Sequence, residues 1–220
     1  MLKLDLQFFG GRGASSGGGD GGATGGVKES DILSTTSLIS ERERQQAEVD
    51  DVLGVLSDFY DEYGAQVDTE IATMKAGSNA LAYYSYDGVV AVNQSYFDSA
   101  KMSTAYAECV KTGFHPSNGS KSAMQAVVAH EMGHKLTADV ATRLGHGDLH
   151  TAAATIVSEA SKRTGKSTKQ MAKSISGYAK KNHAETVAEA ISDVYCNGSK
   201  ASKASRSIVD VVNGYLKGGK

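Results

Sequence analysis

The chain has 220 residues, which is enough for one domain of moderate size. Its formal net charge of −2 gives no electrostatic basis for binding nucleic acid or an anionic membrane. Cys109 and Cys196 are too few for a disulfide framework, and no apolar run approaches the roughly 20 residues that cross a bilayer. We therefore expect no nucleic-acid or membrane partner, and a protein made in the reducing cytoplasm without a signal peptide.

The N-terminal segment consists of a short apolar start and a glycine-rich run. Residues 1–9 alternate apolar and polar side chains, and Asp5 interrupts an apolar core too short for a signal peptide. Ten of the seventeen residues 10–26 are glycine, so this stretch cannot bury enough surface to offset its chain entropy. We predict a flexible Gly-rich tail over residues 1–28 and a folded domain over residues 29–220. The tail is either without consequence or a docking peptide on a tether.

The first half of the predicted domain combines a helix with several strands. Residues 37–63 carry apolar side chains at three- and four-residue spacing, which is typical of an amphipathic helix. Residues 71–74 form a weak strand pattern. Residues 80–86 and 89–92 predict two strands joined by the strong hairpin signal Asp87-Gly88. The edge of this hairpin is suited to hold an extended peptide by strand addition, although an ordinary sheet edge would have the same sequence.

A second helix is predicted over residues 98–112, and a loop follows over residues 113–120. The serine and asparagine residues of this loop offer N-caps to the next helix. We interpret His115, which lies in the loop, and His183 as polar surface residues.

The most informative stretch runs from His130 to His134 and reads H-E-x-x-H. Apolar residues on both sides predict a buried or half-buried helix. Residues four apart share a helix face, so both imidazoles can reach one zinc ion, which readily takes nitrogen ligands. Glu131 would lie beside them as the base that takes a proton from a zinc-activated water. The alternative is a surface helix with these residues by chance, but buried polar groups need partners, and a metal supplies them.

Gly133 is unusual inside such a helix. It costs about 1 kcal/mol relative to alanine in a helix interior. That cost is easier to understand if another backbone passes close to it.

A third zinc ligand is required, and its position distinguishes the classes of enzyme. Thr137 and Val140 stand where the long metzincin motif has glycine and histidine, which excludes that class. Cys109 and Cys196 are too far apart for the P-C-x-x-C motif of nucleobase deaminases. An acid from a downstream helix remains as the supplier.

Residues 182–193 are the obvious source of that acid, because Glu185 and Glu189 share one helix face. An alternative interpretation makes Asn182 and Glu185 a capping box and leaves the other acids solvated. The H-E-x-x-H motif upstream favours the metal site. Residues 145–150 hold two histidines and an aspartate and form a rival cluster, but their glycines predict a loop with no base beside it.

The rest of the chain predicts short helices. They are expected at about residues 151–162, 167–176, 183–196 and 202–216.

Residues 178–190, with the sequence YAKKNHAETVAEA, resemble the zinc-site segment of anthrax lethal factor and related gluzincin toxin-type peptidases. The shared features are a tyrosine, an asparagine, a glutamate seven residues after the tyrosine and an Ala-Glu-Ala, together with the H-E-x-G-H form upstream. The resemblance covers roughly residues 80–195. It implies that Glu185 is the third zinc ligand, that Glu189 orients a ligating histidine and that Tyr178 donates its phenol to the developing oxyanion.

One departure from this family leaves a second assignment open. Thr186 and Val187 stand where the family commonly has aromatic residues. A second gluzincin pattern, E-x-x-x-D, would make Glu189 the ligand and Asp193 the residue that orients a histidine.

The start of the chain, Leu-Asp-Leu-Gln-Phe-Phe-Gly, resembles the first residues of many tailed-phage head proteins from Gram-positive hosts. This resemblance implies a gene in a phage or mobile element and a product that joins the particle.

Together these patterns predict an α+β zincin-like metallopeptidase domain with a small mixed sheet, an H-E-x-x-H helix and a helical C-terminal half. The expected function is zinc-dependent hydrolysis of peptide bonds in a protein or peptide substrate. Two alternatives are a phage head-associated minor structural protein with a non-catalytic metal site, which would contact head proteins through its tail, and a toxin-type effector protease.

Overall fold

The computed structural model describes residues 45–75, 78–85 and 87–218. The predicted tail over residues 1–28, its docking role and its resemblance to phage head proteins lie outside these residues, as does the first part of the predicted helix 37–63. These statements stay predictions.

A small mixed sheet lies next to the first described helix, α2 (Gln46–Tyr63). Strand β1 (Asp68–Ala72) pairs in parallel with β3 (Val89–Asn93), and β2 (Ala82–Tyr84) pairs with β3 in the antiparallel sense. The order β1-β3-β2 makes β3 central, and all five of its residues are buried. The predicted hairpin is therefore confirmed, with β2 at one edge of the sheet.

The conformation of the hairpin turn explains why position 88 is a glycine. Gly88 has a φ of +85°, a conformation that side chains other than glycine rarely adopt. The Ser85 N–H donates to the Val89 carbonyl over 2.9 Å and closes the turn.

Helix α3 (Ser99–Lys111) precedes the long helix α4 (Ala123–Leu144), which carries the H-E-x-x-H motif. Ser122 and Gln125 form a reciprocal capping box at the start of α4. The cap thus lies two residues beyond the loop in which we expected it.

Four α-helices make up most of the C-terminal half of the described chain. They are α5 (Leu149–Thr164), α6 (Thr168–Ile175), α7 (His183–Asn197) and α8 (Lys203–Leu216), and they confirm the four predicted helices. A short 3-10 helix, η3 (Tyr178–Lys180), connects α6 to α7. Most residues of α7 are buried, because the helix packs against α4, α5 and α8 at once.

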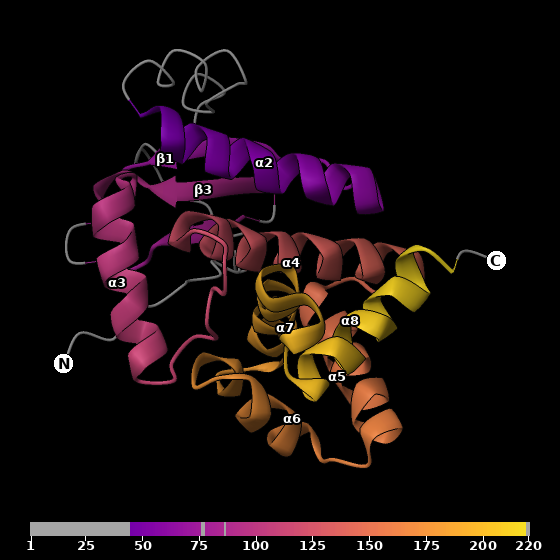
Figure 1. Ribbon diagram of the computed structural model, residues 1–220. Coiled ribbons are helices and arrows are strands. Elements are labelled where there is room, and N and C mark those ends of the chain that lie inside the picture. Colours follow the sequence, from indigo (N-terminus) through magenta and orange to yellow (C-terminus); the bar gives the residue numbers. More distant parts are fainter. Residues whose placement is uncertain (1–44, 76–77, 86, 219–220) are drawn as a thin grey trace, which may run out of the picture.

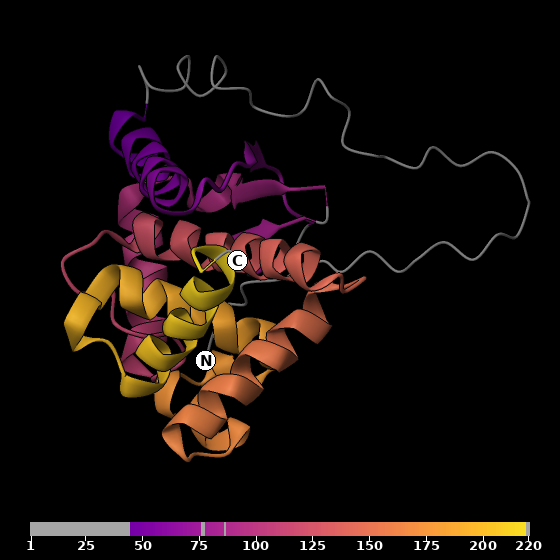
Figure 2. The same ribbon diagram turned by 90° about the vertical axis from the view of Figure 1, so that its right-hand side faces the viewer.

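The two halves of the domain lie on opposite sides of α4. Figure 1 shows α2 and β3 above α4 and the helices α5 to α8 below it, and Figure 2 shows the same order from the side. Helix α4 is accordingly buried along most of its length. The architecture is the expected α+β arrangement of a zincin-like domain. Within the described part of the chain, no helix has both the length and the apolar character to cross a bilayer.

Candidate metal centre

The candidate metal centre lies where α4 and α7 approach each other closely. A Cβ atom added at Gly133 would lie 2.7 Å from the Cα of Ala188, so no larger residue fits between the two backbones. This contact agrees with the close backbone approach expected at Gly133. It brings the imidazoles of α4 to the acidic face of α7.

Three predicted ligands converge at this crossing. His130, His134 and Glu185 are all buried, and each offers a ligand atom within 4.8 Å of the other two. Glu185 Oε2 lies 3.2 Å from His130 Nε2 and 3.4 Å from His134 Nε2. Zinc held tetrahedrally by bonds of about 2.05 Å separates neighbouring ligand atoms by about 3.3 Å. The types of donor atom and the two separations from Glu185 Oε2 therefore fit a zinc ion.

Glu189 does not join this triangle but contacts the other side of one histidine. Its Oε1 lies 2.9 Å from His130 Nδ1, and its Oε2 accepts a hydrogen bond from the Ser176 hydroxyl over 2.6 Å. A carboxylate on the second ring nitrogen fixes which nitrogen of His130 is free to bind a metal.

The alternative assignment, with Glu189 as ligand and Asp193 as the orienting acid, does not match these contacts. The Asp193 carboxylate accepts hydrogen bonds from the backbone of Ser202 and the hydroxyl of Ser205, at the N-terminus of α8. Its other oxygen accepts from Asn197. Asp193 therefore stabilises the N-terminus of α8.

The interpretation of His115 as a surface residue was wrong. We expected a surface residue, but its side chain is 2% exposed, and its Nδ1 lies 2.9 Å from Glu189 Oε1. Burial disfavours the charged imidazole, yet Glu189 outweighs burial and raises the pKa of His115 to about 9. No motif near residue 115 indicates this contact, because its partner is 74 residues away. His183 is exposed, as expected.

Glu131 is fully buried beside the triangle. Neither of its carboxylate oxygens has a hydrogen-bond partner among the described residues. Burial raises its pKa to about 8, against the opposing effect of His130. The backbone of Tyr84 also favours the charged form, which indicates that the edge strand β2 runs close to this carboxylate. A buried carboxylate without a well-formed hydrogen bond is costly, and water or a substrate group would relieve that cost.

Tyr178 reaches the same site from η3. Its hydroxyl lies 3.4 Å from Glu185 Oε1 and accepts a hydrogen bond from Lys181 Nζ over 3.1 Å. The Lys181 ammonium also lies 4.9 Å from the centre of the Tyr178 ring. A cation is thus held beside the phenol.

The side chains of His130, Glu185 and His134 perturb each other's pKa values. Burial disfavours the imidazolium of His130, but Glu185 and Glu189 outweigh it and raise the pKa of His130 to about 10. Burial alone would raise the pKa of Glu185, whereas His134 and His130 hold it well below its usual range. Burial lowers the pKa of His134.

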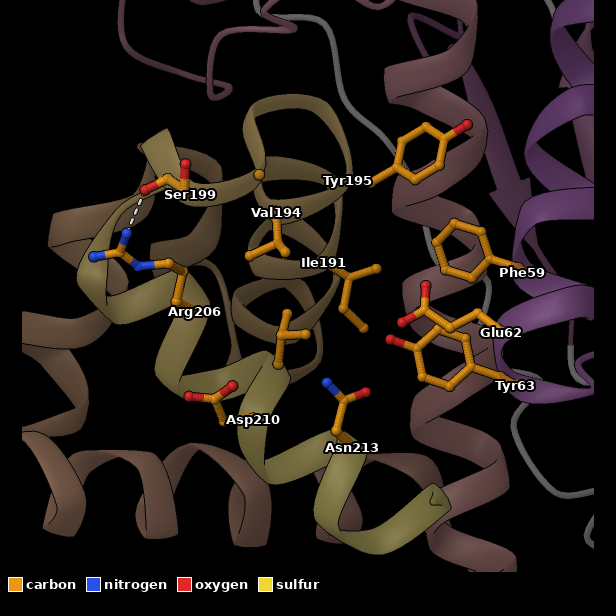
Figure 3. A pocket seen from close by; sticks show the side chains of 12 residues that line it. Phe59, Glu62, Tyr63, Ile191, Val194, Tyr195, Ser199, Arg206, Asp210 and Asn213 are labelled. Carbon is orange, nitrogen blue, oxygen red and sulfur yellow. Dashed lines mark hydrogen bonds between the residues drawn. The ribbon is translucent and has the colours of Figure 1, made fainter. Parts of the chain in front are cut away.

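Two other features of the chain do not contribute to this site. Among the described residues, His146, Asp148 and His150 form no metal-like cluster, and Asp148 caps α5 through the Thr151 N–H. A hollow of about 540 Å³ lies between α2, α7 and α8 (Figure 3), with Ile191 on its wall. None of the predicted site residues lines it. Its residues on α7 lie on the helix face opposite the zinc-site acids.

Comparison with known proteins agrees with the chemistry of this centre. The family model described as "Peptidase family M48" matches residues 43–205, which include both halves of the centre. No curated protein and no solved structure shows significant similarity to the chain. The match extends over most of the chain and over all the elements that supply the buried histidines and acids. The chain therefore belongs to peptidase family M48 and is a zinc-dependent metallopeptidase.

Proposed function

We propose that this metallopeptidase is an endopeptidase of the gluzincin type, with His130, His134 and Glu185 as its zinc ligands. The observation that supports the ligand set is the convergence of two Nε2 atoms on one carboxylate oxygen at 3.2 and 3.4 Å. Glu189 would keep the hydrogen of His130 on Nδ1 and so leave Nε2 for the metal. When bound, zinc supplies Lewis-acid activation of water and lowers the water pKa from near 16 toward about 7.

Glu131 is the proposed general base. It is one residue after His130 on the same helix, so its carboxylate lies beside the ligands. Burial raises the pKa of this carboxyl above its usual range, so its carboxylate is a stronger base than a solvent-exposed one. Glu131 would take a proton from the attacking water and deliver it to the nitrogen of the leaving amine.

Tyr178 is the proposed donor to the oxyanion. Its hydroxyl is held near Glu185, and the Lys181 ammonium next to it favours negative charge in that space. As the carbonyl carbon becomes tetrahedral, its oxygen gains charge that the phenol can stabilise. Lys181 would strengthen this donor by polarising the hydroxyl.

The substrate would lie along β2. This strand pairs only with β3, so its other edge is unpaired among the described strands. An extended peptide can add to such an edge through main-chain hydrogen bonds. The Tyr84 backbone on β2 lies beside Glu131, which would bring the bound peptide to the catalytic base.

The test of this function is the Glu131→Gln variant of the full chain. Because the amide keeps the shape but cannot take a proton, we expect one bound zinc and a kcat about 10² to 10⁴ lower on a quenched fluorescent protein substrate. Glu159→Gln on α5, which changes a carboxylate bound to Tyr215, is the matched control and should keep full activity. A Glu131→Gln protein that cleaves as fast as the unchanged chain would exclude the proposed base.

Tyr178→Phe tests the oxyanion donor. Loss of one such donor should lower kcat by about 10² to 10³ with little change in KM or bound zinc. Steady-state kinetics and metal analysis on the same sample measure both. An unchanged kcat would remove Tyr178 from the mechanism.

The biological setting of the activity is a separate proposal. The N-terminal residues motivate a phage or mobile-element protease that joins the particle, with toxin-type and structural alternatives. Quantitative mass spectrometry of purified particles, with cleavage assays on head proteins, separates these settings. A chain absent from the particles would exclude the head role.

A further inference from the structure

His115 lies in the loop between α3 and α4, outside the motifs that carry the proposed chemistry. Its ring stacks on Tyr106, with centroids 5.5 Å apart and an interplanar angle of 7°. Phe114 packs edge-on against it at 5.0 Å. The imidazole is thus held in one orientation by aromatic neighbours.

The polar edge of this ring points at Glu189. His115 Nδ1 and His130 Nδ1 each lie 2.9 Å from the same oxygen, Oε1 of Glu189. A carboxylate oxygen can accept two such bonds, so both histidines carry hydrogen on Nδ1. The other oxygen accepts from the Ser176 hydroxyl. Glu189 is therefore held from three directions, and only one of them is the histidine that it orients.

Packing alone does not account for a histidine at this position. Its Nε2 is buried and has no hydrogen-bond partner within the described residues, although the Cys109 side chain interacts with the imidazole. Leaving such a nitrogen unsatisfied costs about 1 to 3 kcal/mol. An apolar ring would stack on Tyr106 without that cost. What a histidine adds at this position is the hydrogen bond from Nδ1 to Glu189.

The loop that carries His115 is itself fixed to the centre. The backbone N–H groups of Gly177 and Tyr178 donate to the carbonyls of Gly113 and Phe114, over 2.7 and 2.9 Å. The His115 ring also contacts the Tyr178 ring, with centroids 5.3 Å apart. The loop therefore has a rigid base from which a side chain can position a second one.

We propose that His115 is a positioning residue, which fixes the carboxylate of Glu189 and through it the metal-binding orientation of His130. This inference rests on the proposed function, since it assumes that His130 Nε2 binds zinc. A glutamate side chain has three rotatable bonds, and each additional hydrogen bond reduces the rotamers it can occupy. Partners of this kind typically contribute 10-fold to 100-fold to metal affinity.

Three substitutions separate the hydrogen bond from the packing. His115→Asn places an amide N–H where Nδ1 was, His115→Gln places it where Nε2 was, and His115→Phe keeps only the stacked ring. We expect zinc dissociation constants for the Gln and Phe variants that are about 10-fold to 100-fold weaker than for the unchanged chain. The Asn variant should stay within about threefold. Competition with a chromophoric chelator on the full-length protein measures these constants.

Controls distinguish a general loss of stability from a loss of positioning. Tyr106→Phe keeps the ring that stacks on His115 but removes its buried hydroxyl, which donates to the Pro116 carbonyl. This change should leave zinc affinity unchanged. In a Glu189→Gln background, His115→Phe should weaken binding by less than twofold, because the residue it positions is already altered.

The outcomes are distinct. Equal zinc affinity in the Phe, Gln and unchanged proteins, or equal losses in the Asn, Gln and Phe variants, would overturn the positioning role. If the Phe variant does not fold, the comparison of Asn with Gln decides alone. If zinc affinity were insensitive to His130→Ala, the proposed function would fail as well, whereas a normal His130 requirement with no His115 effect would overturn only this inference.

Discussion

Glu185 and Glu189 lie four residues apart on one helix face, yet their surroundings differ. The first contacts two Nε2 atoms, and the second contacts two Nδ1 atoms. An Nδ1 that already donates to a carboxylate cannot bind a metal at the same time. Their contacts therefore favour Glu185 as the ligand and Glu189 as the orienting acid.

Substitution of each acid by alanine tests this division. Glu185→Ala should lose stoichiometric zinc, because two histidines alone hold it weakly. Glu189→Ala should keep a zinc site that is about 10-fold to 100-fold weaker. Metal analysis after dialysis against a fixed zinc buffer measures both variants. Loss of zinc in the second variant only would reverse the assignment.

The sequence predicted some of these residues for a physical reason. Four-residue spacing on a helix is local, so His130, His134 and the acids of α7 could be found without a structure. His115 could not, because its partner is distant in the chain and its loop has no periodicity. The pairing depends on how loop 113–115 packs, and the carbonyls of this loop accept hydrogen bonds from Gly177 and Tyr178.

At the scale of elements, the crossing of α4 over α7 depends on one small residue. Gly133 has no side chain, and Ala188 lies against it. The helix termini were predictable because capping residues such as Ser167, Asn182 and Ser202 are visible in the sequence. The close approach of α4 and α7 was not predictable in the same way, because it depends on how two helices far apart in the sequence pack.

Gly133→Ala should therefore destabilise the fold despite the better helix propensity of alanine. The added methyl group would lie 2.7 Å from a backbone atom that cannot move aside, and such overpacking costs about 1 to 3 kcal/mol. Gly54→Ala in α2 is the matched control. Nothing lies within 4 Å of its added Cβ, so it should stabilise by up to about 1 kcal/mol. Urea unfolding measures both, and equal effects of the two changes would contradict this account.

On the scale of the whole molecule, a bound zinc ion would connect α4 to α7 and thereby the two halves of the domain. Zinc at 100 times its dissociation constant stabilises the folded state by about 2.7 kcal/mol. For a domain of this size, removal of zinc by a chelator should lower Tm by about 5 to 10 °C. Differential scanning calorimetry measures the shift. His134→Ala protein should show none, and a chelator-insensitive Tm in the unchanged chain would contradict the linkage.

In the proposed binding mode, the short edge of the sheet would limit what the enzyme recognises. Strand β2 has three residues, a length of roughly 10 Å. A strand of that length can form main-chain hydrogen bonds with only two or three residues of a bound peptide. Most discrimination among cleavage sites would then come from side-chain contacts. Any unfolded segment that can extend over two or three residues could form the main-chain hydrogen bonds.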